Sequence, residues 1–75
     1  MFHTEEERLI IMINQIAQNN RSAGDDNAIA DVIHGHISKF WSRRMKQQLI
    51  AYIENGGNEL HPSALLAGQR LDVAA

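Results

Sequence analysis

The side chains of this chain that could do chemistry are its four histidines and one short run that mixes aromatic and basic residues. His34 and His36 are two positions apart, a spacing that turns them about 200° from each other on a helix. Zinc-binding histidines on one helix are spaced to face the same side, and no cysteine is present to complete a site. We therefore predict no metal site, and we expect His36 to pack against neighbouring aromatic rings.

The run from Lys39 to Lys46 contains the only tryptophan, one of the two phenylalanines and four of the seven lysine and arginine residues. Trp and Arg are over-represented among the residues that dominate binding between proteins. This run therefore suggests a partner-binding surface. The alternative is a corner between two helices, in which the aromatic rings fill a small core and the charges stay in water.

The sequence contains no pattern that predicts catalysis. The glycine-rich loops of nucleotide-binding proteins and the Gly-x-Ser-x-Gly turn of serine hydrolases are absent. The acidic stretch 5–7 and the pair Asp25-Asp26 fit helix N-termini, where negative charge is favourable. We therefore predict no catalytic residue and no independent enzymatic activity.

Helices must position these residues, because apolar side chains recur at helical spacing along the chain. Thr4 followed by Glu7 is the pattern of a capping box, and Ser42 is a favourable N-cap. Gly56 and Gly57 form a strong stop signal. The predicted helices span about residues 5–19, 27–40, 43–55 and 62–70.

Two of the predicted helices have clear apolar faces that should be buried. In the helix at 5–19 the face comprises Leu9, Met12, Ile13 and Ile16. In the helix at 27–40 it comprises Ile29, Val32, Ile33, Ile37 and Phe40. Ile10, Ile11 and Ala17 widen the first face, and a helix apolar over so much of its surface is covered by neighbouring helices or by another chain.

The predicted fold is all-α: a compact bundle of three helices plus a shorter C-terminal fourth helix. It forms a single domain over residues 1–75, with frayed ends at about 1–4 and 72–75. A domain of this size buries only about 60% of its unfolded surface. Binding to a partner would add to its stability.

Charge and hydropathy indicate where the protein is located and which kinds of partner it can bind. The formal net charge of −2 gives no overall attraction to nucleic acid. The acidic N-terminus lacks the order of a signal peptide, and no apolar stretch approaches the ~20 residues that span a bilayer. We expect a cytoplasmic protein that binds neither membranes nor nucleic acid.

Two other functions stay open on the residues alone. Arg43, Arg44 and Lys46 lie in the first turn of the helix at 43–55, as in the recognition helix of a small helix-turn-helix-like DNA-binding protein. The acidic start of the first helix would, however, repel phosphate. The apolar excess of that helix also fits a self-associating helical module, and hence a homo-oligomer of the isolated chain.

Two stretches of the sequence resemble signatures of a known family. Residues 12–17 (Met-Ile-Asn-Gln-Ile-Ala) resemble a signature near the N-terminus of the delta subunit of NAD-dependent formate dehydrogenases. Residues 36–45 resemble its second signature, a His, a basic residue, Phe-Trp and then Arg-Met. Leu49, the Gly56-Gly57 pair, Leu60 and Pro62 follow in the same order. The resemblance covers roughly residues 9–66, without the loop at 19–27.

The resemblance implies an accessory role. In this family the delta subunit is a small, cofactor-free component of a cytoplasmic complex. The large (alpha) subunit holds a molybdenum or tungsten pterin and iron–sulfur clusters, and other subunits hold flavin and iron–sulfur centres. The delta chain is expected to dock on the large subunit and to support assembly, cofactor loading or stability, without catalytic, cofactor-binding or metal-binding residues of its own.

The two signatures also imply which residues contact the partner. Phe40 and Trp41 would be aromatic anchors, and Arg44 would hydrogen-bond to a carboxylate or carbonyl of the partner. The full predicted set is Asn14, Gln15, His36, Lys39, Phe40, Trp41, Arg44 and Met45.

Overall fold

The computed structural model describes residues 4–71, so that the expected frayed ends lie outside the described residues apart from Thr4. All regular structure in this range is helical, which confirms the all-α class. The elements are α1 (Glu5–Asn19), the short 3-10 helix η1 (Arg21–Ala23), α2 (Asp26–Phe40), α3 (Arg43–Glu54) and α4 (Pro62–Gln69). Each α-helix begins and ends within one residue of its predicted bounds.

Local hydrogen bonds explain these boundaries. Thr4 and Glu7 form the predicted capping box, with the Glu7 amide donating to Thr4 Oγ1 at 3.1 Å and the Thr4 amide to Glu7 Oε1 at 3.0 Å. Asp25 caps α2 by accepting a hydrogen bond from the Ala28 amide at 2.9 Å. The α2 helix therefore starts at Asp26, one residue earlier than predicted.

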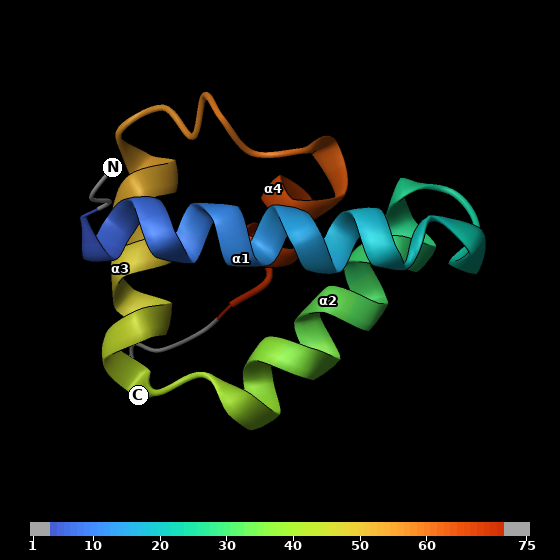
Figure 1. Ribbon diagram of the computed structural model, residues 1–75, viewed down its shortest axis with the longest axis horizontal. Helices are drawn as coiled ribbons and strands as arrows, with labels where there is room; N and C mark the ends of the chain where they lie inside the picture. Colours follow the sequence, from blue (N-terminus) through green and yellow to red (C-terminus); the bar gives the residue numbers. More distant parts are fainter. Residues whose placement is uncertain (1–3, 72–75) are drawn as a thin grey trace.

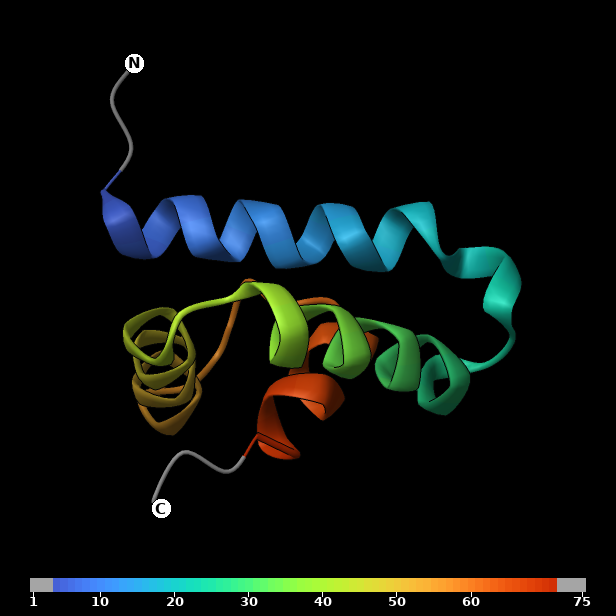
Figure 2. The ribbon, with the colours of Figure 1, turned by 90° about the horizontal axis from the view of Figure 1, so that it is seen from below.

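The helices form two layers. Figure 1 shows α1 lying across the front of the molecule, and Figure 2 shows α2, α3 and α4 together beneath it. The α1 helix contacts each of the other three helices, and the most extensive contact is between α2 and α4. Because α3 runs across α1 rather than alongside it (Figure 1), the description as a bundle stays an interpretation.

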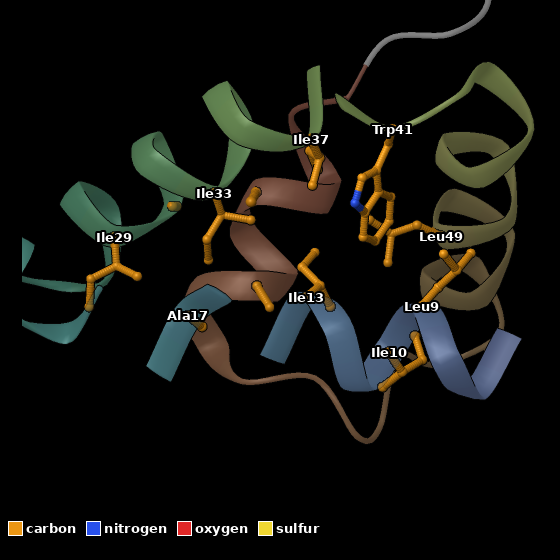
Figure 3. Packing of buried hydrophobic residues seen from close by; sticks show 12 residues of the cluster. Leu9, Ile10, Ile13, Ala17, Ile29, Ile33, Ile37, Trp41 and Leu49 are labelled. Carbon is orange, nitrogen blue, oxygen red and sulfur yellow. The ribbon is translucent and has the colours of Figure 1, made fainter. Parts of the chain in front are cut away.

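The core lies between the two layers. Its largest fully buried side chains are Ile13, Ile33, Ile37 and Leu49. Figure 3 shows the Trp41 ring between Ile37 of α2 and Leu49 of α3. Small residues of α4, Ala64 and Ala67, are fully buried and let this helix approach α2 closely. No helix within residues 4–71 has the length and apolar character needed to cross a membrane.

Four residues on the predicted apolar faces are exposed. Ile11 is 41% exposed and Met12 is 38% exposed, because the side of α1 that faces the core carries Leu9, Ile10, Ile13 and Ala17. Val32 is 40% exposed and Phe40 is 70% exposed. The α2 helix ends at Phe40, and the next residue, Trp41, fills the corner where the chain turns into α3. The predicted buried faces were therefore wrong at these positions.

Candidate partner-binding surface

The eight residues predicted to contact a partner differ in their environments. Trp41 is 5% exposed and belongs to the core cluster. Its indole nitrogen is buried without a hydrogen-bond partner among the described residues. Trp41 is thus a core residue of the isolated chain, with little of its surface left for contact with a partner.

Asn14 has a structural role that the sequence did not reveal. Its Nδ2 donates to the carbonyl oxygen of Glu59 at 2.8 Å, and its Oδ1 accepts from the amide of His61 at 3.0 Å. The hydroxyl of Tyr52 accepts from the Glu59 amide at 3.1 Å. The half-buried Asn14 therefore joins α1 to the segment before α4. Sequence reasoning missed this role because the partners lie 45 and 47 residues away.

Met45 also contributes to the fold. The Ser42 side chain accepts a hydrogen bond from the Met45 amide at 3.1 Å. The Met45 sulfur lies 3.5 Å from the Ser42 amide, where a capping box usually places a Glu or Gln oxygen. Its side chain is half-buried against the core. Gln15, in contrast, is exposed on α1.

The remaining predicted residues lie on or beside an exposed row of α2. Val32, His36 and Phe40 follow one another at intervals of four residues and are exposed, and we call them the α2 ridge. The rings of His36 and Phe40 are in contact, with centroids 4.9 Å apart and planes tilted by 46°. This contact confirms the expectation that His36 packs against an aromatic ring.

Beside the ridge lies a basic corner, formed by Lys39, Arg43, Arg44 and Lys46 around the turn from α2 to α3. The Arg44 guanidinium pairs with the Glu5 carboxylate at 3.2 Å, and both side chains are well exposed. Lys46 donates to the carbonyl oxygen of Ser38 at 3.1 Å. His36, Lys39, Phe40 and Arg44 are all exposed within the stretch 36–44 around this turn.

A second feature is an open groove of about 590 Å³ between α1, η1, α2 and the start of α4. Arg21, Asp26 and His61 line it together with apolar side chains such as Ile29. It contains none of the predicted site residues. Within residues 4–71 no group of three or more His, Cys, Asp or Glu side chains is arranged to hold a metal ion.

Comparison with known proteins identifies the family. Residues 8–67 match the family model described as NADH-dependent formate dehydrogenase delta subunit (FdsD). The chain belongs to this delta-subunit family. The match confirms the resemblance seen in the two signatures, and it spans the Asn14 hydrogen bonds, the α2 ridge and the basic corner. Searches of curated proteins and of solved structures gave no match.

Proposed function

We propose that this delta-subunit family member is a non-catalytic accessory subunit that docks on the large subunit of a cytoplasmic formate dehydrogenase. There it supports assembly, cofactor loading or stability of the complex. The observation that carries the proposal is the family match over residues 8–67. The exposed apolar and basic residues of α2 and α3 support a docking role.

The signature residues have two different roles under this proposal. Asn14, Trp41 and Met45 shape the domain through internal contacts. The exposed members of the set, Gln15, His36, Lys39, Phe40 and Arg44, are available to a partner. Cofactors would belong to the partners: a molybdenum or tungsten pterin and iron–sulfur clusters in the large subunit, and flavin elsewhere in the complex.

Co-expression with a tagged large subunit tests the docking role. Recovery of the delta chain in near-equal amount with the large subunit supports it, and recovery of the large subunit without the delta chain contradicts it. Expressing the large subunit without the delta chain then distinguishes a role in stability from a role in cofactor loading. A lower yield of large subunit indicates stabilisation, whereas a normal yield with less molybdenum or tungsten, measured by elemental mass spectrometry, indicates cofactor loading.

The helix-turn-helix alternative has weaker support. The family match over residues 8–67 is to a formate dehydrogenase subunit, and no comparison supports a DNA-binding protein. A salt-dependent mobility shift that requires Arg43, Arg44 and Lys46 would favour this alternative over docking.

A further inference from the structure

Phe40 is the most exposed large apolar residue among the described residues. It is the last residue of α2, and Val32 and His36 precede it on successive turns. Four residues correspond to about 6 Å along a helix, so the ridge is about 12 Å long. A helix that binds in a groove of another protein uses anchor residues on successive turns of one face, and Val32 and Phe40 are the apolar residues of this ridge.

The contact between His36 and Phe40 restricts the Phe40 side chain in the unbound protein. With ring centroids 4.9 Å apart, the imidazole limits the rotation of the Phe40 side chain before any partner arrives. Less side-chain entropy is then lost when Phe40 enters a pocket. The ring is thus a suitable central anchor.

The charges beside the ridge define the partner further. Lys39 is exposed and directly precedes Phe40. Arg44 lies two residues into α3 with a side chain that is 74% exposed, and its pair with Glu5 is at the surface. A surface ion pair of this kind is weak enough for another carboxylate to replace Glu5. Both cations are therefore available to acidic groups of a partner.

A second copy of this chain fits this surface poorly. A two-fold axis that places Phe40 against Phe40 would also bring Lys39 of one copy close to Lys39 of the other, because Lys39 directly precedes Phe40. Like charges placed opposite each other at an interface disfavour binding. An acidic partner surface has no such penalty.

From these observations we infer that the α2 ridge binds in an apolar groove of the large subunit, that Phe40 occupies a pocket in it, and that carboxylates at the groove's rim pair with Lys39 and Arg44. The inference rests on the proposed function and specifies the chemistry of the surface that the large subunit must present.

A competition experiment tests this inference on the assembled complex. Untagged wild-type delta chain and a mass-distinguishable variant are co-expressed in equal amounts with a tagged large subunit, and the ratio recovered in the complex is measured by mass spectrometry. Phe40→Ser should be under-represented by about 30-fold or more, the effect expected of a binding hot spot. The matched control is Ile11→Ser, which changes an apolar residue on α1 that is 41% exposed, and its ratio should stay within about threefold of one.

A charge reversal tests the acidic rim. At low salt, less of the Lys39→Glu variant than of the wild-type chain should be recovered with the large subunit. At high salt the ratio of variant to wild type should move back toward one, because screening weakens the new repulsion. Arg21→Glu, in η1 at the other end of α1, is the matched control and should compete equally with the wild type. Circular dichroism of each variant verifies that it is folded.

Each outcome decides the inference. If wild-type chain is recovered and Phe40→Ser competes as well as Ile11→Ser, the inference is wrong while the proposed function stands. If the large subunit recovers neither form, both are wrong. If sedimentation shows a wild-type dimer that Phe40→Ser abolishes, while the variant still competes for the large subunit, the ridge binds a second copy and the inference is overturned.

Discussion

Two consecutive aromatic residues illustrate how position in the chain decides the role of a side chain. Trp41 and Phe40 are similar in size and hydrophobicity, yet Trp41 is buried and Phe40 is exposed. Trp41 lies at the turn between α2 and α3, where its ring is between Ile37 of α2 and Leu49 of α3 (Figure 3). Phe40 faces outward at the end of α2. The two residues therefore affect different properties of the protein.

Trp41→Ala should destabilise the isolated chain by about 3–5 kcal/mol, because it removes a large buried ring and leaves a cavity. A loss of that size would leave a domain of this length largely unfolded. Phe40→Ala, its matched control, should change the free energy of unfolding by less than about 1 kcal/mol. Urea denaturation followed by circular dichroism measures both.

Trp41→Phe refines the comparison. The indole nitrogen has no hydrogen-bond partner among the described residues, so phenylalanine loses volume but no hydrogen bond. This variant should be more stable than Trp41→Ala. A folded Trp41→Ala chain that no longer binds the large subunit would contradict the core role and make Trp41 an interface anchor.

At the scale of the elements, Asn14 fixes the segment between α3 and α4. Asn14→Ala removes one donor and one acceptor, which should lower the free energy of unfolding by about 1–3 kcal/mol in total. Amide exchange provides a local measurement, since the His61 amide loses its acceptor and should exchange faster. Gln15→Ala is the neighbouring control and should leave that amide unchanged. An unaltered His61 amide in Asn14→Ala would contradict the role assigned to Asn14.

Two glycines should respond oppositely to the same substitution. Gly57 follows α3 with φ +60°, a conformation that costs an L-residue roughly 1–2 kcal/mol. Gly35 lies within α2, and a Cβ placed there would have no atom outside its own helix within 4 Å. Gly57→Ala should therefore lower the melting temperature, whereas Gly35→Ala should raise stability by up to about 1 kcal/mol. Thermal melts of the two variants check this, and a shift in the same direction for both would contradict it.

At the scale of the whole molecule, the sequence predicted what depends on near neighbours. The helix starts at Thr4 and Ser42 were predictable because each cap contacts a residue three positions away. The burial of Trp41 rather than Phe40 depends on how α3 packs across α1. The bonds of Asn14 depend on a loop far along the chain. Part of the candidate surface, Phe40 and Arg44, was predicted from residue types and the family signatures. Helical periodicity, however, assigned Phe40, Val32 and Met12 to buried faces, because periodicity alone does not fix how a helix is turned.

Binding to the large subunit should leave a footprint on one side of the molecule. Any binding stabilises the whole domain, by about 2.7 kcal/mol when the partner is at 100 times its Kd, and this slows exchange of amides that open only on global unfolding. Amides that exchange through local opening report the docking face instead.

The last turn of α2 and the turn at Trp41 and Ser42 should therefore become protected in the complex, while η1, at the opposite end of α1 (Figure 1), should exchange as before. Hydrogen–deuterium exchange of the free and bound delta chain measures both regions, and protection at η1 without protection near Phe40 would place the partner on the other end of the domain.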